Sequence, residues 1–175
     1  EGEGYSRWIR DRAGWKLLYA DGTYAKGSEI VNEDGSTYEQ ILWEKVNGSW
    51  YAFGIDEDIK SGWVLDRQGA LWYNLSIDSG MRTGWYLDPV DNNYYYLDPI
   101  SGYMHVGWRE IDGAWYYLSD VLREPTYYYD EETGAWQYNV QSIIRPYGAM
   151  YSDELTPDGY FVTESGAWDG NALRF

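Results

Sequence analysis

Short apolar runs rich in Trp and Tyr alternate along this chain with polar stretches rich in Gly, Asp and Asn. Runs of this length bounded by turn residues are typical of β-strands, and two runs joined by a short turn form a β-hairpin. The dipeptides Asn47-Gly48 and Asp112-Gly113 each separate two runs, and both accept the positive φ angles of a two-residue hairpin loop. The polar segments 66–69 and 88–93 separate two further pairs of runs. The pattern therefore predicts consecutive β-hairpins and no helix in this region.

The hairpins recur with a regular period. Trp63, Trp85 and Trp108 each follow a glycine and lie 22 and 23 positions apart, and Trp43 extends the series backward by 20 positions. A unit of this size cannot bury a core by itself, so it must stack on its neighbours. We therefore predict an all-β solenoid of stacked β-hairpin repeats of about 20 residues, with atypical caps at its ends.

The repeats are regular in the middle of the chain and irregular at its ends. We predict an N-terminal cap with one degenerate repeat over residues 1–42, regular hairpin repeats over 43–118, and a degenerate repeat with a closing segment over 119–175. Within the cap, Gly14-Trp15 is expected to open the degenerate unit. Terminal units of solenoids are commonly atypical, which accounts for both ends.

The second strands of the four regular units share one pattern, with aromatic residues at the start and an apolar residue at the fourth position. Alternate residues of a strand point to opposite faces, so the first and third positions share one face. We expect the fourth position to pack inside the stack and the first position to face the junction between units. The first-position residues are Trp50, Trp72, Tyr94 and Trp115, and the fourth-position residues are Phe53, Leu75, Leu97 and Leu118.

The composition explains how such a chain can fold. Leu, Ile, Val and Phe together make up less than a fifth of the residues, and the net charge is −16, a balance that is typical of disordered chains. However, 11 Trp and 20 Tyr supply large, partly apolar side chains. Each of these can bury about 150–250 Å². The core is therefore expected to be built mainly from aromatic rings.

Charge and composition also exclude several classes of function. The chain has no Cys, which excludes a disulfide scaffold and a thiolate metal site. Only 13 Lys and Arg face 29 Asp and Glu, which argues against nucleic acid or an anionic membrane as a partner and favours a cationic ligand or a neutral glycan. No apolar run approaches the length of a membrane span. The opening EGEGYSRW has no features of a signal peptide, so we expect the chain to be a fragment excised from a longer protein.

The candidate catalytic groups do not form a catalytic pattern. The acidic clusters 56–58 and 130–132 lie in expected loops, where solvated turns are the ordinary interpretation, and nothing indicates the two carboxylates at a defined separation that a glycosidase needs. His105 is the single histidine, so neither a His-based metal site nor a Ser-His-Asp triad is expected. No calcium-loop or phosphate-loop motif is present. We predict a chain that is not an enzyme and has no cofactor or metal.

The repeats resemble a known family. Two successive units read GWYLDPVDNNYYYLDPISGYMHVG and GWREIDGAWYYLSD, and Gly-Met elements occur at Gly80-Met81 and Gly102–Met104. These strings are similar to the cell-wall-binding repeats, also called choline-binding repeats, of Gram-positive bacterial surface proteins and lytic enzymes. The resemblance covers residues 43–118 and, more loosely, the flanks. It implies a β-hairpin solenoid, secretion, and attachment to teichoic or lipoteichoic acid of the cell wall through choline groups.

The resemblance also implies a site. A quaternary ammonium cannot donate hydrogen bonds, so its recognition depends on the faces of aromatic rings around the charge. The family's clefts lie between neighbouring hairpins. Ala52 and Asn74 replace the third-position ring in two units, whereas Tyr96 and Tyr117 keep it, which favours the clefts led by Trp85 and Trp108. Carried onto this chain, the four clefts are Trp43, Trp50 and Trp63; Trp63, Trp72 and Trp85; Trp85, Tyr94 and Trp108; and Trp108, Trp115 and Tyr117.

Two other functions remain open at this stage. Closely similar repeats in other bacterial proteins bind sugars, and sugar rings also stack on Trp and Tyr. Alternatively, the rings serve only to bury surface between units, and the chain is a structural spacer or an interaction stalk. The sequence does not decide among a choline-bearing wall polymer, a glycan and no small ligand, and it leaves the oligomeric state open.

Overall fold

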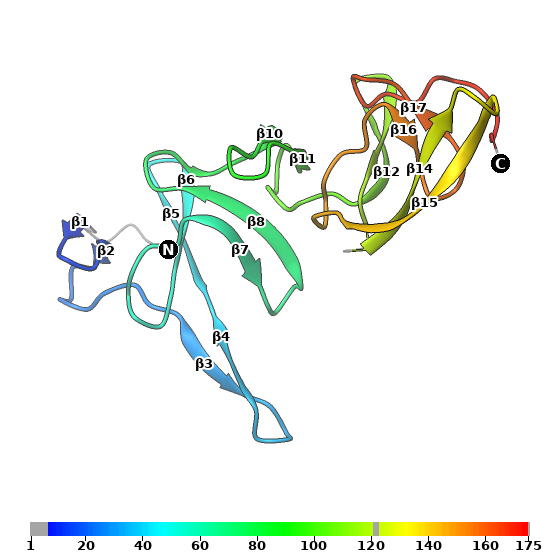
Figure 1. Cartoon of the computed structure of the whole chain (residues 1–175). Coiled ribbons are helices and arrows are strands. Elements are labelled where there is room, and N and C mark those ends of the chain that lie inside the picture. The colour runs from blue at the N-terminus through cyan, green and yellow to red at the C-terminus, as the bar shows by residue number, and fades with distance from the viewer. Residues whose placement is uncertain (1–6, 121–122, 175) are drawn as a thin grey trace. The chain divides into compact units, whose positions relative to one another are not determined.

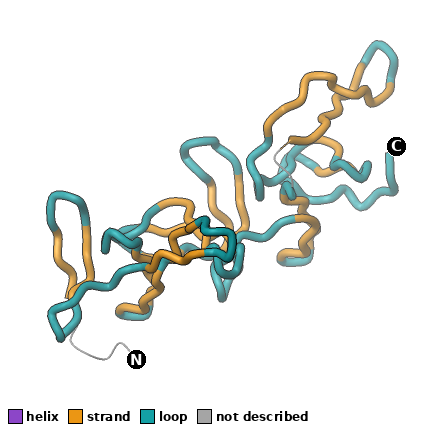
Figure 2. Tube along the Cα trace, turned by 90° about the horizontal axis from the view of Figure 1, so that it is seen from below, coloured by secondary structure: helices purple, strands orange, loops and turns teal. Residues whose placement is uncertain are grey.

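Every regular element of the described residues is a β-strand (Figures 1 and 2). The computed structural model describes residues 7–120 and 123–174, so residues 1–6 of the opening segment EGEGYSRW lie outside them. The described residues cluster into two compact units. Unit 1 contains the residues up to Thr83 together with Pro99–Tyr103, and unit 2 contains Gly84–Asp98 and the residues from Met104 onward. In the described part of the chain, no helix is long and apolar enough to cross a membrane.

Unit 1 consists of consecutive antiparallel hairpins. Strand pairs β1–β2, β3–β4 and β5–β6 each form a two-stranded sheet, and β7, β8 and β9 form a three-stranded sheet in that order. The strands are β1 (Arg7–Arg10), β2 (Trp15–Leu18), β3 (Ser28–Val31), β4 (Thr37–Gln40), β5 (Leu42–Val46), β6 (Ser49–Phe53), β7 (Gly62–Asp66), β8 (Leu71–Ser76) and β9 (Gly80–Met81).

Unit 2 follows the same plan, with β10–β11, β12–β13, β14–β15 and β16–β17 as antiparallel pairs. Its strands are β10 (Gly84–Leu87), β11 (Tyr94–Leu97), β12 (Gly107–Ile111), β13 (Ala114–Leu118), β14 (Arg123–Asp130), β15 (Ala135–Ile144), β16 (Glu154–Leu155) and β17 (Phe161–Val162). The predicted all-β architecture of hairpin repeats is confirmed. The division into residues 1–42, 43–118 and 119–175 follows the regularity of the repeats and stays a prediction.

The two predicted hairpin turns are confirmed by their backbone angles. Asn47 and Gly48 have φ angles of 50° and 84°, and Asp112 and Gly113 have φ angles of 50° and 86°. Two successive residues with positive φ are the requirement of a type I′ turn, whose twist matches that of the flanking strands. The turn dipeptides therefore set the register in which β5 pairs with β6 and β12 pairs with β13.

The fourth position of each second strand forms the core, as predicted. Phe53, Leu97 and Leu118 are completely buried, and Leu75 is 2 % exposed. In unit 1 the buried residues join different hairpins, because side chains of β2 and β6 form one cluster and side chains of β6, β7 and β8 form another. The β5–β6 hairpin therefore contributes to two core clusters, which explains how units too small to fold alone become stable.

The N-terminal unit differs from the prediction. Gly14-Trp15 does not open a hairpin, because Trp15 begins β2, the second strand, and pairs with Arg10 of β1. The leading ring of this unit is Trp8 on β1. Trp8 and Trp15 therefore correspond in position to the first-strand and second-strand rings of the later hairpins. The prediction that the unit begins at Trp15 is therefore wrong. In the later units a Gly-Trp pair opens the first strand, whereas Gly14-Trp15 stands at the start of the second strand, and the dipeptide alone does not distinguish these two positions.

The hairpin β14–β15 is an insertion within a repeat. In the regular unit β10–β11, Leu97 at the end of the second strand forms a bridge with Met104 in the following link. In the unit β12–β13, the corresponding Leu118 forms its bridge with Met150. The hairpin over residues 123–144 is therefore inserted after Leu118, and the same repeat is completed at Met150. Figure 1 shows this hairpin as the longest pair of strands in unit 2.

Gly27 lies where the backbone of neighbouring segments passes closest. A Cβ atom at Gly27 would lie 2.4 Å from the carbonyl oxygen of Gln40 and 3.1 Å from that of Phe53, while the Gly27 amide donates to Gly54. We therefore expect Gly27→Ala to lower the free energy of unfolding by about 1–3 kcal/mol, because the backbone must shift to admit the methyl group. Denaturant unfolding measures the loss. Gly69→Ala is the matched control, since its nearest side-chain atom lies 3.9 Å away, and equal stability of both variants would contradict the packing.

Candidate functional site

Pockets lined by aromatic rings occur in both units. The first, which we call the Trp43 pocket, lies in unit 1 and has a volume of about 410 Å³. Trp43 on β5 and Trp50 on β6 come from one hairpin, and Tyr73 comes from β8 of the next. The ring centroids of Trp43 and Tyr73 lie 4.9 Å apart in an edge-to-face arrangement. The full lining is Trp43, Trp50, Asp66, Tyr73, Met81, Ile100 and Ser101.

The second, the Trp108 pocket, lies in unit 2 and has a volume of about 280 Å³. Trp108 on β12 and Trp115 on β13 belong to one hairpin. Tyr160, just before β17, and Trp168, in the segment after β17, supply the other rings. Tyr160 stands edge-on to both Trp108 and Trp168, with centroid separations of 5.9 Å in each case. The lining is Trp108, Trp115, Asp158, Tyr160 and Trp168.

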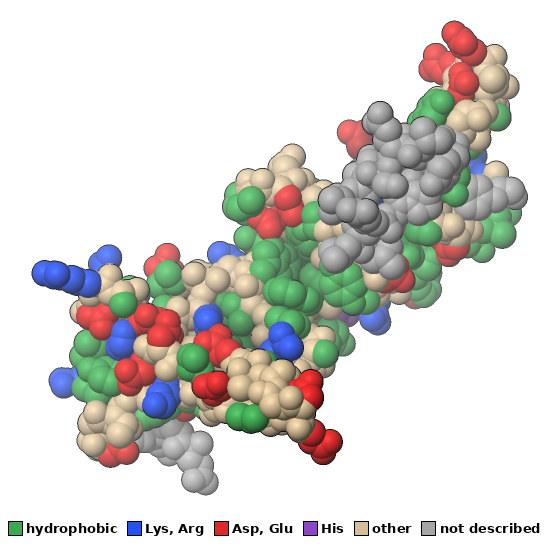
Figure 3. Space-filling model, turned by 60° about the horizontal axis from the view of Figure 1, so that its bottom comes forward, with side chains coloured by type: hydrophobic (Ala, Val, Ile, Leu, Met, Phe, Trp, Pro, Cys, Tyr) green, Lys and Arg blue, Asp and Glu red, His purple; other side chains and the backbone are tan. Residues whose placement is uncertain are grey.

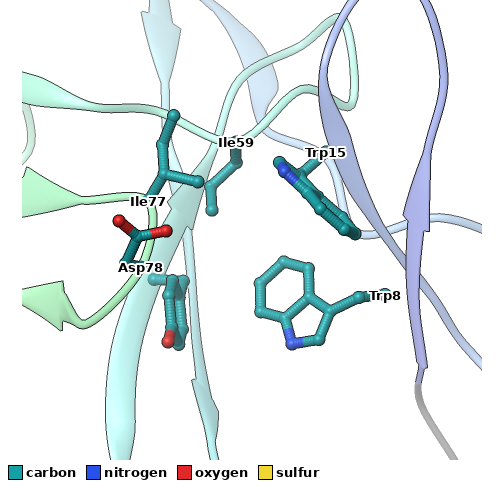
Figure 4. Close-up of a pocket in the computed structure, with 6 residues that line it drawn as sticks. Trp8, Trp15, Ile59, Ile77 and Asp78 are labelled. Atoms are coloured by element: carbon teal, nitrogen blue, oxygen red, sulfur yellow. The ribbon is translucent and has the colours of Figure 1, made fainter.

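The third, the Trp8 pocket, lies in unit 1 and has a volume of about 250 Å³. Figure 4 shows Trp8 and Trp15 on one side of the pocket and Ile59, Ile77 and Asp78 on the other. Tyr51 on β6 completes the lining, and its ring centroid lies 4.9 Å from that of Trp8. Sequence reasoning missed this pocket. A signal for it was present, because Trp8 and Trp15 have the same seven-residue spacing as Trp43 and Trp50.

The three pockets share one plan. One hairpin supplies a ring from its first strand and a ring from the start of its second strand, and a hairpin later in the chain supplies a tyrosine. That later hairpin is β5–β6 in the Trp8 pocket, β7–β8 in the Trp43 pocket and β16–β17 in the Trp108 pocket. Each pocket also contains one aspartate. The second-strand rings Trp50 and Trp115 are 40 % and 42 % exposed, so a substantial part of each indole remains open to solvent. Such partly open cages of rings can receive a small group with an apolar or cationic surface.

The rings around Trp85 form a fourth cluster in unit 2. Trp85 lies edge-on to Tyr94, Tyr96 and Tyr116, with centroid separations of 6.5, 5.0 and 4.9 Å. Tyr96 also contacts the His105 ring at 5.1 Å, and His105 Nε2 lies 3.0 Å from the Asp98 carboxylate. The histidine therefore supports a ring of the cluster from the link between hairpins. Trp85 and Tyr94 are 37 % and 45 % exposed, which leaves ring surface available.

The structure brings together most of the residues predicted for the clefts, but with different third rings. Trp43 and Trp50 share a pocket with Tyr73 instead of Trp63. In the same way, Tyr116 contacts Trp85, where Trp108 was predicted as the third ring. These tyrosines occupy the second position of the second strand, and each contacts the leading ring of the preceding hairpin. Their neighbours in the strand point to the opposite face, because side chains alternate along a strand.

Three further predicted residues have different surroundings. Tyr117 contacts Trp108 at 5.2 Å but is 7 % exposed and packs on Tyr151, so it supports the Trp108 ring from within the core. Trp63 lies on β7 opposite Asn74, and Trp72 lies on β8 opposite Leu65. Both indoles are half-buried. Their assignment to a cleft stays a prediction.

Carboxylates contact the leading tryptophans of two pockets. Trp43 donates its indole N–H to Asp66 Oδ2 at 3.0 Å, and Trp108 donates to Asp158 Oδ2 at 2.9 Å. Burial favours a higher pKa for Asp66, but hydrogen bonds from Gln40 and Trp43 outweigh it and hold the pKa below its usual value. Asp66 is therefore negatively charged at neutral pH. On the face shown in Figure 3, Asp and Glu side chains lie among hydrophobic ones.

The chemistry of the pockets is that of a binding site for a small, weakly hydrated group. Ring faces attract cations and apolar surfaces, and the carboxylates add negative charge beside them. Within the described ranges, no group of three or more His, Asp or Glu side chains is arranged to hold a metal ion. The acidic clusters 56–58 and 130–132 lie in turns, where Asp56 and Asp130 accept backbone amides at Asp58 and Glu132.

Several solved structures are similar to this chain. The chain is similar to the modular Cpl-1 endolysin complexed with a peptidoglycan analogue, with 25 % identity, a TM-score of 0.50, and coverage of 100 % of this chain and 40 % of that one. It is equally similar to a multimodular pneumococcal cell-wall endolysin from phage Cp-1 complexed with choline, with 25 % identity, a TM-score of 0.50, and coverage of 99 % and 39 %.

A third similar structure is choline-binding protein F from Streptococcus pneumoniae, with 28 % identity, a TM-score of 0.42, and coverage of 94 % of this chain and 57 % of that one. The chain thus spans about two fifths of the length of the two endolysins. No protein-family model matches the chain, and no curated protein sequence matches it.

Proposed function

Because the chain belongs to the family of cell-wall-binding, or choline-binding, repeats, we propose that it is a non-catalytic module that binds choline groups of teichoic or lipoteichoic acid. The observation that carries the proposal is the recurring cage, in which two rings of one hairpin share a pocket with a tyrosine of a later hairpin. One similar endolysin structure contains choline. The same ligand fits here because a trimethylammonium group needs ring faces and no hydrogen-bond acceptor.

The strength of one cage follows from its rings. Each cation–π contact contributes about 0.5–2 kcal/mol, with Trp the strongest partner. At about 1–2 kcal/mol for each ring of a partly desolvated cage, three rings together contribute about 3–6 kcal/mol, which corresponds to dissociation constants from millimolar to tens of micromolar. The Trp43 pocket and the Trp108 pocket each contain at least this number of rings. A single site therefore binds weakly.

Repetition compensates for this weakness. A wall polymer presents many choline groups, and once one cage is occupied the others meet their ligands at a high effective concentration. The presence of cages in both units supports such multivalent binding. We propose that the chain acts as the wall-attachment part of a longer secreted, cell-wall-associated protein, whose other activities lie outside the chain.

The exposure of the second-strand rings favours a ligand over a purely structural role. Rings that serve only to pack hairpins together gain most when they are fully buried. Trp50, Tyr94 and Trp115 instead keep 40–45 % of their surface exposed, at the mouths of the cages or in the Trp85 cluster. The aspartate in each pocket favours a cation over a neutral glycan. These features support choline more than a saccharide or a spacer function.

Titration with choline tests the proposal. We expect tryptophan fluorescence to change with a saturable, millimolar or tighter, dependence on choline concentration, because the cages contain indoles. Glucan oligosaccharides and muropeptide saccharides serve as the comparison. The absence of a response at tens of millimolar choline would contradict the choline function, and a response to saccharide alone would indicate a glycan-binding module. No response to any of these ligands would indicate a spacer.

A further inference from the structure

The same hydrogen bond occurs in two cages that lie in different units. In each, the leading indole of one hairpin donates its N–H to an aspartate of a hairpin later in the chain. Asp66 ends β7, the strand that follows the hairpin of Trp43, and Asp158 lies in the turn between β16 and β17, which follow the hairpin of Trp108. The bond therefore crosses between stacked hairpins and links the ring to the unit that completes its cage.

Each aspartate is itself held in place. Asp66 accepts hydrogen bonds from Gln40 Nε2 at 3.0 Å and from the backbone amide of Gln68 at 3.2 Å. Asp158 accepts a hydrogen bond from the Thr156 hydroxyl, and Thr156 is completely buried. A carboxylate anchored in this way fixes the direction of the indole N–H, so the ring plane cannot turn freely about its side-chain bonds. The indole therefore presents one of its two faces to the pocket.

The carboxylate also lines the pocket that the indole forms. Asp66 belongs to the lining of the Trp43 pocket and Asp158 to that of the Trp108 pocket. Its negative charge therefore lies at the wall of the pocket, next to the indole N–H at the edge of the ring. A fixed charge at this place attracts a cation and contributes little to the binding of a neutral group of the same shape.

We propose that Asp66 and Asp158 determine the specificity of the cages, by orienting the leading indole and by favouring a cationic ligand over its neutral isostere. The proposal rests on the proposed choline-binding function. It separates two contributions of one side chain: the hydrogen bond sets ring geometry, and the charge sets the preference for a cation. Removing the charge while keeping a hydrogen-bond acceptor should therefore change selectivity and leave the shape of the cage intact.

The test compares choline with 3,3-dimethylbutanol, in which a carbon atom replaces the charged nitrogen. Binding is followed at the indole N–H resonances of Trp43 and Trp108, assigned through Trp→Phe variants. The native protein is expected to bind choline more tightly than the neutral isostere. In Asp158→Asn, the amide oxygen still accepts the indole N–H, and the amide nitrogen faces the Thr156 hydroxyl, which can accept as well as donate. Choline affinity at the Trp108 pocket should therefore fall about tenfold while isostere affinity changes less than twofold. Asp66→Asn should also lower choline affinity at its pocket, but its amide nitrogen faces the donors Gln40 Nε2 and Gln68 N, so a loss of isostere affinity is expected there as well.

Two further variants sharpen the result. Asp66→Ala removes both charge and acceptor, so both ligands should weaken at the Trp43 pocket. Asp34→Asn removes an equal charge from the exposed turn between β3 and β4 and should leave both affinities unchanged, with thermal unfolding confirming that every variant is folded. An unchanged ratio of choline to isostere affinity in both Asn variants would overturn this inference and leave the choline function standing. Failure of the native protein to bind choline would overturn both.

Discussion

Replacement of Leu118 by alanine is expected to lower the free energy of unfolding of unit 2 by about 2–5 kcal/mol. Leu118 is completely buried at the fourth position of β13. It pairs with Gly107 of β12 and forms a bridge with Met150, where the chain returns after the inserted hairpin. The loss of stability therefore has two parts. The protein loses the free energy gained by burying the leucine side chain, and a cavity is left at the point where the two parts of one repeat meet. Denaturant-induced unfolding measures the loss.

Leu87→Ala provides the matched control within unit 2. Leu87 lies on β10 and is 43 % exposed, so its truncation removes little buried surface, and a change within about 0.5 kcal/mol is expected. A loss for Leu118→Ala no larger than that for Leu87→Ala would show that the fourth position does not form the core of the repeat.

Replacement of Trp115 by alanine is expected to lower choline affinity at the Trp108 pocket by about tenfold or more, because a desolvated cation–π contact with Trp contributes up to about 2 kcal/mol. The Trp115 ring is 42 % exposed and its strand pairing uses backbone atoms, so the fold should be retained. Isothermal titration calorimetry gives the affinity, and the circular dichroism melting curve gives the stability.

Trp136→Ala distinguishes loss of a cage ring from loss of any tryptophan. Trp136 lies on the inserted hairpin, where its ring contacts Tyr129 and Phe161. It is not among the residues that line the Trp108 pocket. Choline affinity should remain at the native value in this variant. A destabilised Trp115→Ala protein with unchanged choline binding would instead assign that ring to packing.

The parts of the fold that depend on residues adjacent in the sequence could be predicted. Asn47-Gly48 and Asp112-Gly113 define their turns because few residues tolerate two positive φ angles in succession. Burial of the fourth position, as at Leu97 and Leu118, follows from the alternation of side chains along a strand. Trp43, Trp50, Trp108 and Trp115 line pockets, and their role in binding a ligand stays a prediction.

The parts that depend on how hairpins stack could not be predicted. Whether Tyr73 or Trp63 reaches the Trp43 ring is decided by the offset between two hairpins, which no local pattern specifies. The hydrogen bond between Trp108 and Asp158 joins residues 50 positions apart. The inserted hairpin separates Leu118 from the segment that completes its repeat, so the end of that repeat was not recognised in the sequence. The Gly-x-Met element at Gly148–Met150 marks this end, because it matches the one at Gly102–Met104.

A crystal structure of the protein grown in saturating choline tests the central claim most directly. The account predicts trimethylammonium groups in the Trp43 pocket and the Trp108 pocket, each within about 6 Å of the centroids of three rings. The Asp66 and Asp158 carboxylates should remain hydrogen-bonded to the indoles in that structure. Cages that stay empty of choline, or choline bound only away from the rings, would contradict it.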